Sequence, residues 1–217
     1  MKRCMILANG QPPKKRDFDF ITKNGFNHLF CADGGANSAV KFNIIPDCII
    51  GDLDSIRPEV YDYYFDKCEI IKIDRQNDTD VEKCIKHAIK YGFDEVLLLG
   101  ATGDRLDHSF CNLGLVFKYF EHISIKILHQ RSLLAAFSGK VHLNTLSGET
   151  ISLYGKDSRT RVKSTGLKYP LKNISLPFGK RESTSNVALG KSVELKISGG
   201  IIFVIRDFGI MKNNDLF

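Results

Sequence analysis

Residues 28–54 read HLFCADGGANSAVKFNIIPDCIIGDLD, in which two short apolar runs flank a glycine pair and a helical pattern. The runs near 29–32 and 48–51 are apolar throughout, which is typical of strands buried on both faces of a parallel sheet. Such strands separated by helices indicate an α/β fold with helices on both faces. Ligands of this fold bind beyond the carboxyl ends of the strands, where this stretch carries its aspartates.

The same alternation runs through the first half of the chain and stops near residue 123. Strands are expected near 3–8, 29–32, 48–51, 69–73 and 96–99, and helices near 17–25, 36–42, 58–66, 80–91 and 106–120. Beyond it, short alternating strands are expected near 123–128, 133–137, 150–153, 159–163, 193–197 and 201–206, without a helix. We therefore predict a mostly parallel, Rossmann-like α/β domain over 1–123 and an all-β sandwich or barrel-like domain over 124–217.

The composition is that of a globular protein, and its charge is unevenly distributed. Of 217 residues, 43% are hydrophobic and 26% charged, which excludes the disordered, collagen-like and membrane classes. The formal charge of +6 divides into −3 for 1–123 and +9 for 124–217. This asymmetry suits a metal ion and a polyanionic small ligand better than a nucleic-acid duplex. The nearest basic stripe, Arg159, Arg161 and Lys163, alternates like the solvated face of a strand, and contact with a polyanion is the alternative.

The cysteines and the N-terminus predict a cytoplasmic protein. All six cysteines lie in the first half, none forms a CxxC pair, and several sit inside apolar runs, as expected of reduced thiols. Their spacing resembles no zinc site. The apolar run at 4–8 is shorter than the roughly 7–15 residues of a signal-peptide core. No segment approaches the ~20 apolar residues of a membrane span.

Two predicted strands are followed by aspartates with possible chemical roles. The first group is Asp33-Gly34-Gly35, whose glycines allow a sharp turn and a close approach to an anion; the alternative is a simple strand-to-helix turn with Asp33 as a cap. The second pair is Asp52 and Asp54, which point the same way if the backbone stays extended. Two such carboxylates repel each other unless a cation lies between them, and Mg²⁺ is the natural candidate. A helix cap at Asp54 or Ser55 is the alternative and leaves Asp52 unexplained.

Two further groups stand at the same predicted edge of the sheet. Thr79 and Glu82 have the spacing of a capping box, and Asp80 either complements the helix dipole or adds a third carboxylate. The loop after Val96–Leu99 does not match a P-loop. Its Arg105 could bind a phosphate through two hydrogen bonds, with Asp107 orienting it or joining the metal shell. His108 is a helical histidine that is either structural or touches the ligand.

The residues alone therefore indicate an α/β protein suited to Mg²⁺ and a nucleotide polyphosphate, and leave the second substrate open. Six motifs in order then resemble the thiamine pyrophosphokinase family along nearly the whole chain. They are ADGGAN at 32–37, IGDLDSI at 50–56, TD at 79–80 with EK at 82–83, RLDH at 105–108, TGLKY at 165–169 and STSN at 183–186.

The resemblance implies an enzyme that transfers a diphosphoryl group from ATP to the hydroxyethyl oxygen of thiamine and releases AMP. It implies a Mg²⁺ requirement and a homodimer, with each site between the α/β domain of one subunit and the β domain of the other. By the same resemblance, Asp52, Asp54 and Asp80 surround Mg²⁺; Arg105 and Asp107 serve the phosphates; Asp33, Gly34, Gly35 and His108 bind the nucleotide; and Tyr169, Ser185 and Asn186 bind thiamine.

Three residues depart from the family pattern. Asn77 stands where the family commonly has Asp, Asp104 replaces a glycine before Arg105, and Tyr169 replaces a common Trp while keeping an aromatic face. Two other functions remain open: a pyrophosphokinase for another aromatic alcohol, such as a hydroxymethylpterin, and a nucleic-acid-binding module based on the basic second half.

Overall fold

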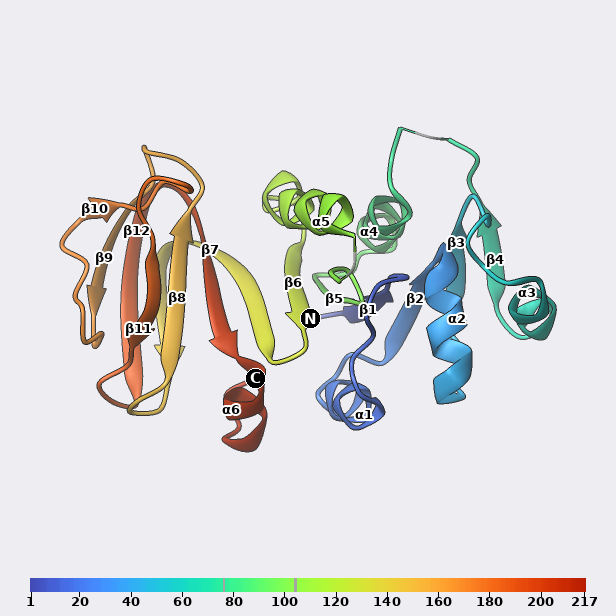
Figure 1. Cartoon of the computed structure of the whole chain (residues 1–217), viewed down its shortest axis with the longest axis horizontal. Helices are drawn as coiled ribbons and strands as arrows, with labels where there is room; N and C mark the ends of the chain where they lie inside the picture. Colours follow the sequence, from blue (N-terminus) through green and yellow to red (C-terminus); the bar gives the residue numbers. More distant parts are fainter. Residues whose placement is uncertain (76, 104) are drawn as a thin grey trace. The chain divides into compact units, whose positions relative to one another are not determined.

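The computed structural model (Figure 1) describes residues 1–75, 77–103 and 105–217. The fold is mixed α/β, and its contacts divide the chain into two compact units, Met1–Gln130 and Arg131–Phe217. The first unit extends past residue 123 because the strand that follows pairs with the parallel sheet rather than opening the second unit. None of the helices in the described parts of the chain is long and apolar enough to cross a membrane.

The described residues of the first unit form six parallel strands. These are β1 (Arg3–Leu7), β2 (His28–Ala32), β3 (Cys48–Gly51), β4 (Glu69–Lys72), β5 (Glu95–Leu99) and β6 (Ser124–His129), in the spatial order β6-β5-β1-β2-β3-β4. Each neighbouring pair in this order is parallel. The chain moves outward from β1 to β4 and then returns to the other side of β1, so the strand order reverses between β1 and β5. Open α/β sheets bind their ligands at this kind of switch point.

Helices connect the strands. They are α1 (Lys15–Lys23), the 3₁₀ turn η1 (Asp33–Gly35), α2 (Ala36–Ala39), η2 (Val40–Phe42), α3 (Pro58–Tyr64), α4 (Asp80–Lys90) and α5 (Leu106–Lys118). Figure 1 shows α4 and α5 on one side of the sheet and α1 on the other. The Thr79 half of the expected capping box is confirmed, because Thr79 Oγ1 accepts a hydrogen bond from the Glu82 N–H over 3.3 Å. The Glu82 carboxylate does not complete the box; it accepts hydrogen bonds from Lys118 Nζ and Tyr119 Oη. The Thr79 cap fixes where the helix begins and hence where Asp80 lies.

The second unit consists of antiparallel strands and one short helix. Its elements are β7 (Ser132–Asn144), β8 (Thr150–Gly155), β9 (Arg161–Thr165), β10 (Ile174–Ser175), β11 (Ser183–Val187), β12 (Ser192–Asp207) and α6 (Phe208–Asn213). β12 pairs with β7 along its length, with β9 through its first half and with β8 through its second half. Both halves contribute to one apolar core that includes Leu153, Val162 and Leu195.

Two expectations for this unit were wrong. The segments predicted at 193–197 and 201–206 form the single strand β12, and α6 follows it. The register shifts between Ile197 and Ile202, where Gly199 adopts φ +72°. The bulge changes which residues face the core, from Val193, Leu195 and Ile197 to Ile202 and Val204, and so interrupts the period-two pattern.

Candidate active site

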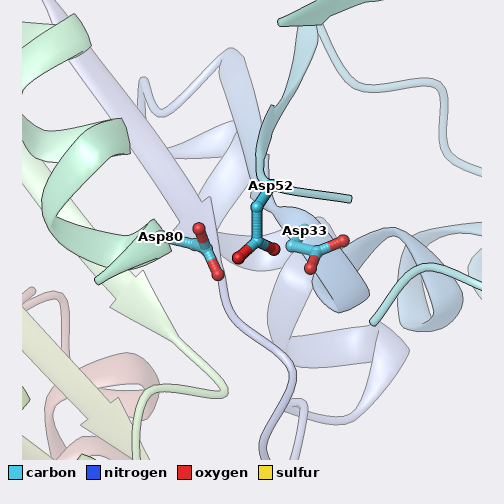
Figure 2. Close-up of side chains that lie close together, drawn as sticks. All are labelled: Asp33, Asp52 and Asp80. Atoms are coloured by element: carbon cyan, nitrogen blue, oxygen red, sulfur yellow. The ribbon is translucent and has the colours of Figure 1, made fainter. Parts of the chain in front are cut away.

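Three carboxylates converge at the carboxyl edge of the parallel sheet (Figure 2). Asp33, Asp52 and Asp80 each offer an oxygen, and these atoms lie within 4.8 Å of one another. The residues follow β2, follow β3 and begin α4, respectively. Gly51 permits this approach, since a Cβ there would lie 2.7 Å from Asp33 Cβ and 3.2 Å from Asp80 Oδ1. Parallel strands thus deliver aspartates that are far apart in sequence to one place.

Asp33 is the most buried of the three. It is 2% exposed, has φ +41°, and its two carboxylate oxygens accept hydrogen bonds from the N–H groups of Ser55 and Ile56, each over 3.0 Å. Burial raises the pKa of Asp33 to about 6; the two N–H donors oppose this, and the charges of Asp80 and Asp54 add to it. A bound cation would remove the repulsion within this group.

The carboxylate cluster, defined as Asp33, Asp52 and Asp80, fits Mg²⁺ by the chemistry of its donors. Mg²⁺ takes oxygen ligands and is typically held by one or two carboxylates together with substrate phosphates. Among the described residues, this is the group of acidic, cysteine or histidine side chains whose ligand atoms lie close enough for one ion. The donor set contains no nitrogen or sulfur that would favour zinc.

The expectation that Asp52 and Asp54 point the same way rested on an extended backbone, and that premise was wrong. Leu53 between them has φ +68°, a left-handed conformation that leucine rarely adopts. Asp52 lines the cavity described next and Asp54 does not. The Asp54 carboxylate instead accepts a hydrogen bond from Ser55 Oγ over 2.8 Å. Residues other than glycine in this conformation cluster at functional sites.

A cavity of about 500 Å³ lies over the cluster, entirely within the first unit. Its wall comes from the segments at or just after the carboxyl ends of β1, β2, β3 and β5, from residues 77–79, from the first turn of α4 and from the first two turns of α5. Of the predicted residues, Asp33, Gly34, Asp52, Asp80, Arg105 and His108 line it. Gly35 packs behind the wall, where a Cβ would lie 1.9 Å from the Leu7 carbonyl oxygen. The site is therefore a built cavity at the switch point of the sheet.

Arg105 and Asp107 are held together at the edge of this cavity. Arg105 Nε donates to Asp107 Oδ1 over 3.2 Å, and the second guanidinium nitrogen donates to Oδ2. These hydrogen bonds lower the pKa of Asp107 to about 2. Asp107 itself does not line the cavity. The geometry therefore favours Asp107 as the group that orients Arg105.

Sequence reasoning assigned no individual role to several residues that line the cavity, among them Asn9, Lys83, Thr102 and Asn112. Lys83 Nζ donates to Asp80 Oδ1 over 2.8 Å. Asn112 Nδ2 donates to the Ala101 carbonyl over 2.6 Å and so ties α5 to the loop after β5. Lys83 follows Asp80 by three residues and Asn112 follows His108 by four, so helical spacing carried the signal for both.

The residues that depart from the family pattern are placed as follows. Asn77 and Asp78 both line the cavity. Asp78 pairs with Lys86 and Arg75, each over 2.7 Å, and the hydrogen bond from Lys86 is the main reason that the pKa of Asp78 is lowered. Asp104 lies outside the described residues. Asp78 is thus an acidic group of the cavity wall that is paired with two cations, and it is not one of the carboxylates that converge at Asp33.

A second cavity, of about 290 Å³, lies in the second unit and is lined by Tyr169 and Asn186 among others. Asn186 is buried, and its Nδ2 donates to the Tyr169 carbonyl and Ser183 Oγ while its Oδ1 accepts from the N–H groups of Tyr169 and Val187. All four hydrogen-bonding positions of its amide are used. Ser185, with φ +54°, is not among the lining residues. Asn186 therefore fixes the backbone of Tyr169, a residue that is 61% exposed.

Comparison with known proteins gives matches along most of the chain. A family model described as thiamin pyrophosphokinase, catalytic domain, matches residues 23–128, and one described as thiamin pyrophosphokinase, vitamin B1 binding domain, matches 140–202. Thiamine pyrophosphokinase 1 of Oryza sativa subsp. japonica is 31% identical over 204 residues, covering 81% of this chain and 77% of its own. Thiamin pyrophosphokinase 1 of Caenorhabditis elegans is 28% identical over 216 residues, which cover 93% of this chain and 88% of the relative.

Solved structures share the fold. The crystal structure of thiamine pyrophosphokinase from Bacillus subtilis superposes with a TM-score of 0.82 at 22% identity, covering 95% of this chain and 99% of its own. Thiamin pyrophosphokinase from Candida albicans superposes with a TM-score of 0.81 at 20% identity, covering 94% of this chain and 88% of its own. At these identities the likeness concerns the fold.

Proposed function

The chain belongs to the thiamine pyrophosphokinase family, and we propose on that premise that it transfers the diphosphoryl group of ATP to the hydroxyethyl oxygen of thiamine. The observation that carries this proposal is the convergence of three aspartates on a cavity at the switch point of a parallel sheet. The alcohol oxygen attacks the β-phosphorus in line with the departing AMP. The bond between that phosphorus and the bridging oxygen of the α-phosphate breaks, and AMP leaves with that oxygen.

The residues that would hold Mg²⁺ are Asp33, Asp52 and Asp80, and Asp54 adds negative charge beside them. When bound, the ion neutralises charge on the phosphate oxygens. Arg105, oriented by Asp107, contacts the phosphates, and Gly34 and His108 complete the nucleotide wall. The proton of the attacking alcohol passes to a carboxylate at this edge. Most of the rate enhancement then comes from positioning and charge neutralisation.

The second unit would supply the thiamine side. Tyr169 offers an exposed aromatic face on which the cationic thiazolium ring can stack, and Asn186 holds the backbone of Tyr169 from both sides. Ser185 directly precedes Asn186 in β11. We infer that the protein is cytoplasmic, which its six free cysteines support. We also infer that it forms a homodimer, and that its two domains are a Rossmann-like nucleotide unit and a β sandwich.

The test is chromatographic analysis of nucleotides and thiamine species after incubation of the pure protein with ATP, thiamine and Mg²⁺. AMP and thiamine diphosphate formed in equal amounts are expected, and the yield should vanish with EDTA. ADP with thiamine monophosphate would indicate stepwise phosphorylation and overturn the proposal. Unchanged ATP and thiamine from folded protein would also overturn it.

A further inference from the structure

A buried cation stands beside the carboxylate cluster, in the wall of the same cavity. Lys83 lies in the first turn of α4 and is 4% exposed. Its Nζ donates a hydrogen bond to Asp80 Oδ1 over 2.8 Å. Within the described parts of the chain, Asp80 is the partner of Lys83. An ammonium group carries three N–H donors and no acceptor. Among the described residues, no other acceptor is bonded to the remaining two donors of this buried charge, so they can reach a ligand in the cavity, where an unmatched donor is costly.

The charges around Lys83 indicate which ligand group those donors suit. Arg105 and Lys83 are the strong bases among the described residues of the cavity wall, and the Arg105 side chain is 65% exposed at the edge. Lys83 is thus the cation in the deep part of the wall. Thiamine is cationic and the nucleoside is neutral, whereas the polyphosphate chain is anionic.

We propose that Lys83 is a phosphate-binding residue that contacts the terminal phosphates of the nucleotide; this inference rests on the proposed function. Its ammonium group bridges Asp80 and the phosphate oxygens, so it binds the substrate group that is transferred and holds Asp80 at the same time. Because Lys is a point charge, it can follow these oxygens as they move toward the acceptor.

A merely structural role for Lys83, limited to neutralising Asp80, makes a different prediction. Loss of Lys83 would then disturb the cluster without distinguishing nucleotides that differ in their number of phosphates. Lys86 provides the matched control, because it lies on the same helix and pairs with Asp78 and Glu82 over 2.7 and 3.5 Å. Lys86 is not among the residues that line the cavity.

The experiment is displacement of a fluorescent ATP analogue from the wild type and from Lys83→Met, Lys83→Arg and Lys86→Met, with Mg²⁺ present. ATP, inorganic pyrophosphate and AMP serve as competitors. Lys83→Met should raise the dissociation constants of ATP and pyrophosphate by about 10- to 100-fold, which is the effect of losing a hydrogen bond to a charged group. The dissociation constant of AMP should change by less than about 2-fold, because AMP lacks the terminal phosphates. Lys83→Arg should recover part of the loss, and Lys86→Met should resemble the wild type.

Equal losses for ATP and AMP, or no loss for either, would overturn the inference. Circular dichroism shows whether Lys83→Met is folded. If it is not, Lys83→Arg carries the test: its binding of ATP should be weakened more than its binding of AMP. Unchanged binding of ATP by Lys83→Arg would then contradict the inference. The proposed function fails separately. A wild type that binds ATP through Lys83 but forms no thiamine diphosphate refutes the function alone. A wild type that forms it, with ATP binding independent of Lys83, refutes this inference alone.

Discussion

Replacing Asp52 with asparagine should stabilise the metal-free protein and remove its response to Mg²⁺. The carboxylate oxygens of Asp33, Asp52 and Asp80 lie within 4.8 Å. Two unit charges at that separation repel by about 3.5 kcal/mol at an effective dielectric constant of 20. Asp52 and Asp80 are partly exposed, so solvent screening reduces this value considerably. We expect a gain of about 1 kcal/mol in the free energy of unfolding, measured above the raised pKa of Asp33 so that all three groups are charged.

Mg²⁺ should reverse the order of the two proteins. An ion present at ~100 times its dissociation constant stabilises the folded state by about 2.7 kcal/mol. The wild type should gain this amount, while the Asp52→Asn variant, which lacks one of the carboxylates, should gain little. The enzyme activity of the variant should fall greatly although its metal-free stability rises.

The assay is urea unfolding followed by far-UV circular dichroism, in EDTA and in excess Mg²⁺, since the chain has no Trp for fluorescence. Asp66→Asn is the matched control, because it makes the same charge change at an exposed position of the same unit. Lower stability of Asp52→Asn in EDTA, combined with an undiminished response to Mg²⁺, would refute the reasoning. Such a result would place Asp52 outside any metal site.

Three further predictions concern the second unit and the response to pH. Glu149→Gln should lower the free energy of unfolding by about 3–5 kcal/mol, because Arg206, which donates to both Glu149 oxygens over 2.6 and 2.9 Å, would be left buried without its counter-charge. The exposed pair of Arg131 with Asp207 is the control, and Arg131→Ala should cost no more than about 1 kcal/mol. Asn186→Ala should raise the KM for thiamine by about 10-fold with little change for ATP, because Tyr169 loses its support; equal changes in both constants would contradict this. Burial lowers the pKa of His87, so the folded state binds fewer protons than the unfolded state, and stability should fall as the pH drops below about 6.5, the ordinary value. His87→Gln should reduce that slope in urea unfolding measured across this range, and an unchanged slope would assign it to other groups.

Local features of the sequence determined much of this protein. Local periodicity is enough to tell a strand from a helix, so the short apolar runs could be assigned as strands. The run Val96–Leu99, for example, falls within β5. The Thr79 cap was equally local. The placement of Asp33, Asp52 and Asp80 at one edge followed from the parallel order of the strands, a rule that needs no coordinates.

Only the tertiary structure decided the contacts between distant segments. The residue pattern could not show that Ser124–His129 pairs with β5, or that the strands expected at 193–197 and 201–206 are one strand through a bulge. Nor could it reveal the left-handed Leu53 that separates Asp52 from Asp54, or the burial of Lys83 against Asp80. Periodicity reports which face of an element is apolar. Register, backbone strain and the partner of a buried charge depend on the free energy of the whole packed chain, and that energy selects one arrangement from several that are locally equivalent.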